Sequence, residues 1–246
     1  MKIKVVENPP IDPREFDLPS EFNEDHIEDI VEIFNTPLVG HYNWDYTDAD
    51  SRIKKLYELG KELNWNGSID LDWSKAIKKG EPPMKAELLA RMEGPLAALP
   101  EEERLEYMWH DQAWGLSQFL HGEQGALLVA SQLVSCAPTY QAKLYAASQT
   151  FDEARHVEVF ARYLREVSGV EYPINKNLKS LIDKILSDPR WDLKFIGMQI
   201  IIEGLALAAF QTTKETTNCA LLRPLVHYVI RDEARHVTLG VNYLED

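Results

Sequence analysis

One hexapeptide, Asp-Glu-Ala-Arg-His-Val, occurs twice in this chain of 246 residues, and no other feature of the sequence restricts the possible fold as strongly. It occupies residues 152–157 and 232–237, which are 80 residues apart, and Glu123 and Glu203 are separated by the same interval. Each half of the repeat therefore contains a glutamate, a gap, and a second glutamate that is followed by a histidine. Internal repeats usually mark repeated structural units, and this one repeats charged residues within apolar segments.

The spacing within each half predicts a helical hairpin. Glu123 and Glu153 are 30 residues apart, and Pro138 stands at their midpoint. Two antiparallel arms of about 15 residues, each roughly 22 Å long, would place both carboxylates at the same level. The corresponding midpoint of the second half is Asn218, in a Thr-Thr-Asn stretch that forms helix weakly. Both halves are thus expected to fold back on themselves with their glutamates side by side.

Helical periodicity dominates the sequence after residue 100, and strand-like alternation is scarce. Four long apolar-periodic segments are predicted at residues 101–136, 140–168, 190–214 and 220–240. The preceding residues suggest an extended arm over residues 1–20 and shorter helices at 23–34, 48–63 and 84–97. We therefore predict an all-α protein in which residues 1–100 form an arm and short helices, packed on a four-helix bundle of residues 101–246.

The four repeated glutamates occupy apolar helix faces. The residues three and four positions away from each glutamate are mostly apolar, so these faces should point into the bundle. Four buried carboxylates without countercharge would be very costly, whereas two divalent cations would balance them. Within each hexapeptide the glutamate and the histidine lie on one helix face. The predicted metal ligands are Glu123, Glu153, His156, Glu203, Glu233 and His236.

The aspartate and the arginine of each hexapeptide have a predicted role beside this site. A metal-bound histidine usually donates its second N–H to a carboxylate. We expect Asp152 and Asp232 to orient the two histidines, each aspartate acting on the histidine of the opposite hairpin. Arg155 and Arg235 would then neutralise those aspartates. Repetition of these residues, in addition to the ligands, favours a site with organised surroundings.

Other residues with chemical potential are more simply explained by packing. His121 and His227 lie off the ligand face, and Trp109 and Trp114 are expected to pack, although either could carry electrons. A set of apolar residues near the ligands should belong to the core, and part of it could line a substrate pocket. This set consists of Phe119, Ala126, Leu127, Phe160, Ala206, Leu207 and Phe210. We predict no catalytic residue beyond the metal ligands.

Composition disfavours several classes of function. The formal net charge is −14 and the pI is about 5.0, so nucleic acid would repel the chain. Cys136 and Cys219 are the only cysteines, which suggests a reducing compartment, and the N-terminus lacks the apolar stretch of a signal peptide. The apolar segments 125–142 and 195–210 contain polar residues and are typical of buried helices. We expect a cytoplasmic protein without a membrane or nucleic-acid partner.

The paired glutamates and Asp-Glu-Ala-Arg-His motifs resemble those of the ferritin-like dimetal-carboxylate superfamily. Within it, they are similar to the branch of ribonucleotide reductase small subunits and bacterial multicomponent monooxygenases, over roughly residues 101–240. The resemblance implies a ferritin-like four-helix bundle that binds two iron ions. The two glutamates and the histidine of each half would bind one iron, with bridging carboxylates shared between the two.

Three positions depart from particular members of that superfamily. Phe160 stands where reductase small subunits usually carry a radical-bearing tyrosine, although some subunits with a heterometal site have phenylalanine there. Leu207 replaces a threonine that is frequent in the multicomponent hydroxylases, and Val229 replaces the third histidine of the arylamine N-oxygenases. The chain therefore matches none of these subgroups fully.

The resemblance implies chemistry with dioxygen. We expect a non-haem di-iron oxygenase or oxidase, with an Mn/Fe pair as an alternative cofactor, acting on an apolar or aromatic small molecule. Electrons would come from a separate reductase or ferredoxin, because the sequence contains no Gly-rich nucleotide-binding motif. Two alternatives stay open: a ferroxidase or iron store, and a radical-generating subunit like that of ribonucleotide reductase. The long region before the bundle favours a substrate pocket or a subunit contact, as in a homodimer, over storage alone.

Overall fold

The computed structural model describes residues 32, 34–47 and 51–245. It divides the chain into Met1–Asn35 and a compact unit, Thr36–Asp246, and the second unit contains all the helices discussed below. The predicted N-terminal arm lies outside the described residues, as does most of the first predicted short helix. The proposed division at residue 100 stays a prediction.

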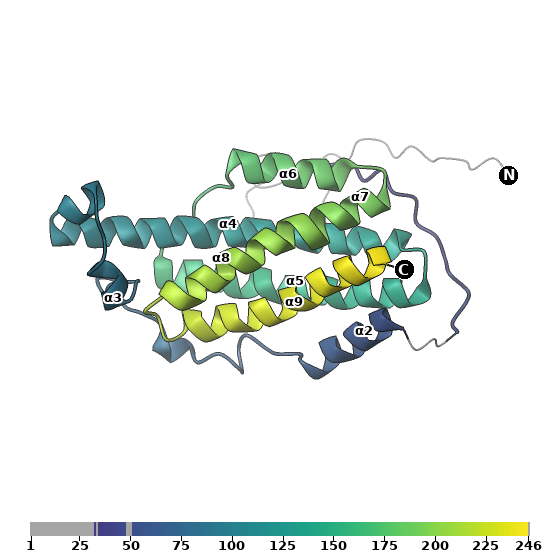
Figure 1. Cartoon of the computed structure of the whole chain (residues 1–246), viewed down its shortest axis with the longest axis horizontal. Coiled ribbons are helices and arrows are strands. Elements are labelled where there is room, and N and C mark those ends of the chain that lie inside the picture. The colour runs from purple at the N-terminus through teal and green to yellow at the C-terminus, as the bar shows by residue number, and fades with distance from the viewer. Residues whose placement is uncertain (1–31, 33, 48–50, 246) are drawn as a thin grey trace, which may run out of the picture. The chain divides into compact units, whose positions relative to one another are not determined.

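Four long helices form two antiparallel pairs. The first pair is α4 (Glu101–Cys136) with α5 (Tyr140–Tyr163), and the second is α8 (Glu203–Thr216) with α9 (Leu222–Glu245) (Figure 1). Helix α8 continues a longer helix that begins with α7 (Trp191–Phe195) and passes through a π-helical segment. The predicted all-α four-helix bundle is therefore confirmed.

Both hairpins turn where the repeat places their midpoints. Helix α4 ends at Cys136, and Pro138 lies in the connection to α5. Thr139 caps α5, because its Oγ1 accepts a hydrogen bond of 3.2 Å from the backbone N–H of Ala142. Asn218 lies in the connection between α8 and α9. Since each hairpin turns midway between its two glutamates, the glutamates are brought to the same level.

The region before the bundle contains short elements. Helix α2 (Arg52–Glu62) lies within the helix predicted at residues 48–63, and it packs on α5 and α9. Its N-terminus is capped by Ser51, whose side chain accepts a hydrogen bond from the backbone N–H of Lys54 at 3.1 Å. A 3-10 turn at Trp73–Lys75 follows, after a connection without regular helix.

The continuous helix predicted at residues 84–97 is wrong. The structure has a short α3 (Ala86–Leu89) and a separate 3-10 turn, Pro95–Ala98. Between them Gly94 adopts a φ of 81°, in the left-handed region that residues with a Cβ rarely occupy. The helix-prone composition of the segment is thus overridden by a glycine turn followed directly by a proline.

Helix α6 (Lys176–Ser187) runs beside α4 on the outer side of the bundle (Figure 1). It approaches α4 at Gly125, where a Cβ atom would stand 2.8 Å from Ile182 Cδ1, so no larger residue fits without movement. The carboxyl end of α6 is closed by the buried Lys194, whose Nζ donates to Ile185 O at 2.6 Å and to Leu186 O. These contacts fix α6 beside the interior of the bundle.

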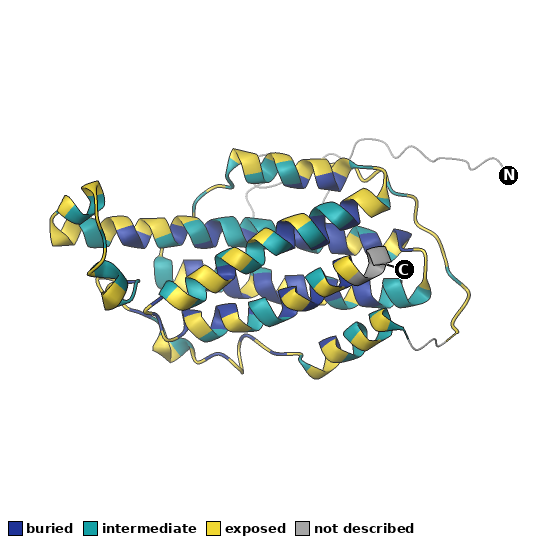
Figure 2. Cartoon of the chain, viewed as in Figure 1, coloured by how far each residue is buried: buried dark blue, intermediate teal, exposed yellow. Residues whose placement is uncertain are grey.

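Buried residues gather on the inner faces of the long helices (Figure 2). The continuous helix Trp191–Thr216 is apolar and long enough to cross a membrane by length and composition alone. However, 44% of its most apolar window is buried, and its inner face carries Glu203 into the bundle. Core helices of bundles often have these properties.

Candidate metal centre

The six predicted ligands converge in the interior of the bundle. They come from all four long helices, and each has at most 5% of its surface exposed. They are Glu123 of α4, Glu153 and His156 of α5, Glu203 of α8, and Glu233 and His236 of α9. The repeat therefore brings four carboxylates and two imidazoles together in a buried region.

Their ligand atoms fall into two overlapping groups. The first position comprises Glu123, Glu153, His156 and Glu233, and the second comprises Glu153, Glu203, Glu233 and His236. Within each group the candidate atoms lie within 4.8 Å of one another. Glu153 and Glu233, the glutamates of the two hexapeptides, belong to both groups. The arrangement could thus hold two cations that share two carboxylates, while Glu123 and Glu203 each serve one position.

Each histidine presents its Nδ1 atom to the carboxylates. His156 Nδ1 lies 3.1 Å from Glu123 Oε2 and 3.2 Å from Glu153 Oε2. His236 Nδ1 lies 3.2 Å from Glu233 Oε2 and 3.2 Å from Glu153 Oε1. Both rings are fully buried. The Nδ1 atoms are therefore the imidazole atoms available to cations at the two positions.

The Nε2 atoms face aspartates of the opposite hairpins. His156 Nε2 lies 3.2 Å from Asp232 Oδ2, and His236 Nε2 lies 3.2 Å from Asp152 Oδ2. This is the crossed arrangement that we expected from the repeat. A carboxylate at Nε2 holds the proton on that nitrogen and leaves Nδ1 free as a metal ligand.

The aspartates and arginines of the hexapeptides form a buried ring of alternating charge. Arg155 donates to Asp152 at 2.5 Å and to Asp232 at 3.0 Å. Arg235 donates to Asp232 at 2.7 Å and to Asp152 at 2.8 Å. Because two arginines neutralise two aspartates, the charge of the four glutamates remains for cations to balance.

The buried carboxylates strongly perturb the pKa values of the cluster. Burial, together with the charge of Glu233, raises the pKa of Glu123 well above its ordinary value, and burial likewise raises that of Glu203. Burial alone would lower the pKa of His156, but the neighbouring carboxylates, Glu123 foremost, raise it well above its ordinary value. The two histidines lower the pKa of the shared Glu153 in spite of its burial. Without cations, protons must therefore provide part of the countercharge.

Comparison with known proteins identifies the fold. No protein-family model and no curated protein matches the chain. A variant of an R2-like ligand-binding oxidase with an aerobically reconstituted Mn/Fe cofactor matches with a TM-score of 0.58 and 20% identity, covering 82% of this chain and 73% of that one. Another variant, with an anaerobically reconstituted Mn/Fe cofactor, gives 0.57 and 22%, covering 78% and 71%. The chain has the ferritin-like fold of the R2-like oxidases.

Within this ferritin-like fold, the donor set fits a pair of metal ions. The buried Glu203 Oε2 has no hydrogen-bond partner, and Glu233 Oε1 accepts none either, although it lies 3.1 Å from His156 Nδ1. Bound cations would satisfy these oxygens, which are otherwise costly to bury. Carboxylate and imidazole ligands suit iron and manganese. The R2-like oxidases with this fold carry an Mn/Fe cofactor, and the buried groups of this chain could bind two metals.

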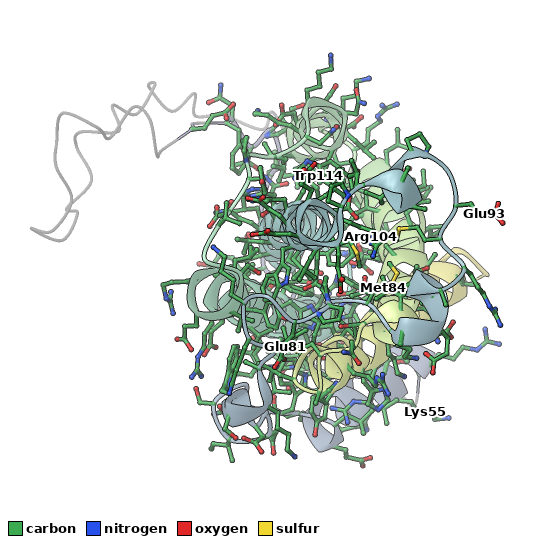
Figure 3. The ribbon with its side chains drawn as sticks, turned by 90° about the vertical axis from the view of Figure 1, so that its left-hand side faces the viewer. Lys55, Glu81, Met84, Glu93, Arg104 and Trp114 are labelled. Carbon is green, nitrogen blue, oxygen red and sulfur yellow. The ribbon has the colours of Figure 1, made fainter. Side chains whose placement is uncertain are left out.

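Trp65 contacts the centre, although the sequence analysis did not single it out. Its Nε1 donates to Asp232 Oδ2 at 2.6 Å, and its ring stacks on His156 with centroids 6.3 Å apart. The ring of the half-buried Tyr228 also stacks with the Trp65 ring, with centroids 5.2 Å apart. By contrast, Trp109 donates to a backbone carbonyl, that of Glu81, at 2.9 Å. Trp114 is exposed on α4 (Figure 3).

Two buried glutamines also lie at the centre. Gln149 Nε2 donates to Glu203 Oε1 at 2.7 Å and to Glu153 Oε1 at 3.2 Å. Gln199 Nε2 in turn donates to Gln149 Oε1. Their sequence signal was present, because each glutamine precedes a ligand glutamate by four residues on an otherwise apolar face.

A mainly apolar cavity of about 220 Å³ opens beside the carboxylates, between α4, α6 and α8. Its walls include Phe119, Ala126, Ala206 and Phe210 from the pocket predicted from sequence. The ligands that it reaches are Glu123, Glu203 and Glu233. Of the other predicted pocket residues, Phe160 is fully buried behind the wall, and Leu127 and Leu207 are half-buried and do not line it.

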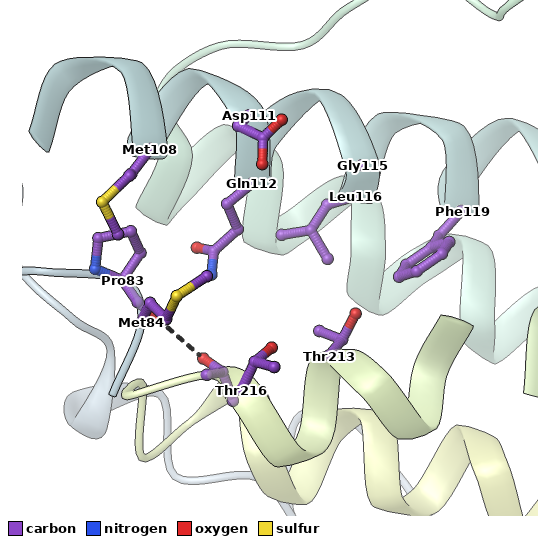
Figure 4. Close-up of a pocket in the computed structure, with 11 residues that line it drawn as sticks. Pro83, Met84, Met108, Asp111, Gln112, Gly115, Leu116, Phe119, Thr213 and Thr216 are labelled. Atoms are coloured by element: carbon purple, nitrogen blue, oxygen red, sulfur yellow. Dashed lines mark hydrogen bonds between the residues drawn. The ribbon is translucent and has the colours of Figure 1, made fainter. Parts of the chain in front are cut away.

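Phe119 also lines a second cavity. The second cavity, of about 190 Å³, continues between α4 and α8 towards the far end of the bundle (Figure 4). Polar side chains line it, among them Asp111, Gln112 and Thr213. Phe119 lines both cavities and packs edge-on against Phe210, with ring centroids 4.6 Å apart. The Phe119 side chain is therefore a common wall of both cavities.

Proposed function

We propose that this chain is a dimetal oxidase or oxygenase that uses dioxygen to oxidise an apolar or aromatic small molecule. One observation carries the proposal: an apolar cavity reaches the same carboxylates that form the candidate metal centre. An iron store has no need of such a cavity, whereas an enzyme must bring an organic substrate next to its metals. Two irons are the leading cofactor, and an Mn/Fe pair is the alternative that the R2-like oxidases suggest.

The residues of the chain divide the work at this centre. When bound, the two metal ions would supply the redox chemistry with dioxygen that no side chain can provide. The glutamates and histidines hold the ions, and Asp152 and Asp232 keep the imidazoles in the orientation that exposes Nδ1. The apolar walls of the cavity exclude water and hold an uncharged substrate against the carboxylates.

The cavity sets the substrate class. A volume of about 220 Å³ suits a small molecule, and the walls contribute aromatic and aliphatic surface with few polar groups besides the ligands. Phe119 and Phe210 offer edges and faces to an aromatic ring. We propose that electrons reach the centre from a separate protein, a reductase or a ferredoxin.

Anaerobic loading with Fe(II), followed by exposure to dioxygen, tests the proposal. We expect two irons per chain and a limited, stoichiometric uptake of dioxygen, monitored by oxygen electrode, optical absorption and Mössbauer spectroscopy. Continued conversion of added Fe(II) into a ferric mineral would instead identify an iron store. A stable tyrosyl radical in the electron paramagnetic resonance spectrum would identify a radical-generating subunit. The same experiment with equal Mn(II) and Fe(II) decides which metal pair the chain selects.

A further inference from the structure

The candidate ligands repeat at an interval of 80 residues, but several residues next to them do not. The 80-residue interval that relates Glu123 to Glu203 also relates Gln149 to Val229 and Phe119 to Gln199. Two polar positions on one side of the centre therefore correspond to two apolar positions on the other. The two amides lie on the side of Glu203, where Gln149 donates to that carboxylate and to the shared Glu153 and accepts from Gln199.

The amide chain has a defined direction. Both Nε2 hydrogens of Gln149 point to carboxylate oxygens, one on Glu203 at 2.7 Å and one on Glu153 at 3.2 Å. Its Oε1 must therefore accept, and Gln199 Nε2 is the donor. The three polar side chains are almost completely buried, with exposures of 1% for Gln149, 0% for Gln199 and 2% for Glu203. Gln199 thus prevents the Gln149 amide from turning over.

This chain affects the two terminal carboxylates differently. Glu203 Oε1 accepts a hydrogen bond from Gln149, whereas Oε2 has no hydrogen-bond partner and is the oxygen more open to a cation. Among the described residues, no side-chain amide donates to Glu123, because Val229 occupies the position equivalent to Gln149. Glu203 is therefore preorganised to bind through one oxygen, whereas Glu123 is free to change its mode of binding.

The backbone is adapted to bring Gln199 to this place. Gln199 lies in the π-helical segment Ile196–Ile202, a type of helix that is rare and frequent at functional sites. Helix α9 passes this segment at Gly240, where a Cβ atom would stand 2.9 Å from Gln199 Cβ. Gly240 is the repeat equivalent of Phe160, so a bulky aromatic of the first half is replaced by the smallest residue beside the amide.

We propose that Gln149, held in orientation by Gln199, is a positioning residue that makes the two metal positions unequal, with tighter binding at the position of Glu203. The inference rests on the proposed dimetal function and adds an order of metal affinity for the two cation positions. Outer contacts of this kind typically change metal affinity by about 10- to 100-fold when they are removed.

The test is a titration of the metal-free chain with Co(II), followed by visible absorption and by the amount of metal bound per chain. In the unmodified protein we expect two binding steps of unequal affinity. Gln149→Leu should keep a capacity of two, weaken the tighter step by about 10-fold or more and change its absorption bands, whereas the weaker step should change less. Gln199→Leu should act in the same direction but less strongly, because it acts through Gln149.

Gln132→Leu is the matched control, since Gln132 is a partly buried amide of α4 without hydrogen-bond partners. Gln132→Leu should leave both binding steps unchanged. This result would show that loss of a partly buried amide does not by itself alter metal affinity. Unchanged affinities in Gln149→Leu, or a larger effect of Gln199→Leu than of Gln149→Leu, would overturn the inference. Failure of the unmodified chain to bind two Co(II) would instead contradict the proposed function, so the two failures are distinguishable.

Discussion

The first hairpin contains a regular α4 of 36 residues, whereas in the second hairpin a π-helical segment of 7 residues precedes Glu203 directly. The hairpins nevertheless carry the same candidate ligands at the same intervals, and all of these residues are buried at one centre. The similarity does not extend to the positions four residues before Glu153 and Glu233, where the first hairpin has Gln149 and the second has Val229. Similar ligands are thus compatible with quite different helices.

The difference teaches which positions are restricted by chemistry. Glu153 and Glu233, the hexapeptide glutamates, belong to both cation groups, and their neighbouring aspartates and arginines form one shared ring. No residue of that ring can change in one hairpin without affecting the other. Residues further away can contact the two cation positions unequally, as Gln149 does by donating to Glu203 of the second position and to the shared Glu153. Such residues are free to differ between the hairpins and to make the two positions unequal.

Removing a shared carboxylate should have the largest effect. Glu153→Ala takes a ligand from both positions, so we expect almost complete loss of stoichiometric metal, measured as bound metal per chain after desalting. Glu123→Ala takes a ligand from the first position only and should retain about one ion per chain. Retention of about one ion per chain by both variants would show that Glu153 is not shared between the two positions. The repeat equivalents Glu233→Ala and Glu203→Ala serve as the matched pair.

Substitutions at one pair of equivalent positions should separate the aromatic side from the amide side. Phe160→Ala removes a buried ring that stacks with Phe210, at a centroid distance of 5.8 Å, and should lower the free energy of unfolding by about 3–5 kcal/mol. Gly240→Ala instead adds a methyl group 2.9 Å from Gln199 Cβ and should cost about 1–3 kcal/mol. Urea unfolding of the metal-free chain measures both values. The opposite order would contradict this description of the two sides.

The crossed aspartates can be tested one at a time. Asp232→Asn removes the carboxylate at His156 Nε2 and Asp152→Asn the one at His236 Nε2, so each should weaken metal binding by about 10- to 100-fold. We expect the larger loss for Asp232, because it also accepts the Nε1 hydrogen of Trp65. Isothermal titration with Co(II) provides the affinities. Equal affinities in the unmodified and both substituted chains would exclude an orienting role.

The pH dependence of loading should be the mildest of these effects. The pKa values of Glu123, Glu203 and both histidines are raised, so in the metal-free chain these groups hold protons that binding must displace. Affinity should therefore increase as pH rises, by about tenfold per pH unit for each proton released. Calorimetry in buffers of different ionisation enthalpy counts those protons. Affinity that falls with rising pH would show that these groups carry no protons for the metal to displace.

Much of the fold could be predicted because its information is local in the sequence. The positions of Pro138 and Asn218 relative to the glutamates set both hairpin turns, and helical spacing set the ligand faces. The break at Gly94 was missed because the surrounding residues favour helix, and a single left-handed glycine decides against it. Such a conformation depends on how the segment meets the rest of the bundle.

The surroundings of the centre could be predicted only in part. The contacts between the hexapeptides follow from the repeat, since equal intervals imply equal geometry. Trp65 gave no such signal, because it stands in a loop and its partner Asp232 is 167 residues away in the sequence. The path from Gln199 through Gln149 depends on a π-helical segment that no periodicity announces. The cavity likewise arises from the placement of α6, which is fixed by close contacts at Gly125.

Because Glu153 and Glu233 belong to both cation groups, neither helical hairpin carries a complete coordination shell of its own. Metal uptake should then follow docking of the two hairpins, and bound ions should stabilise the docked state against separation. The two halves then depend on each other, because loss of a shared glutamate, Glu153 or Glu233, from one half should release both ions. Selection on either hairpin is thereby selection on the pair.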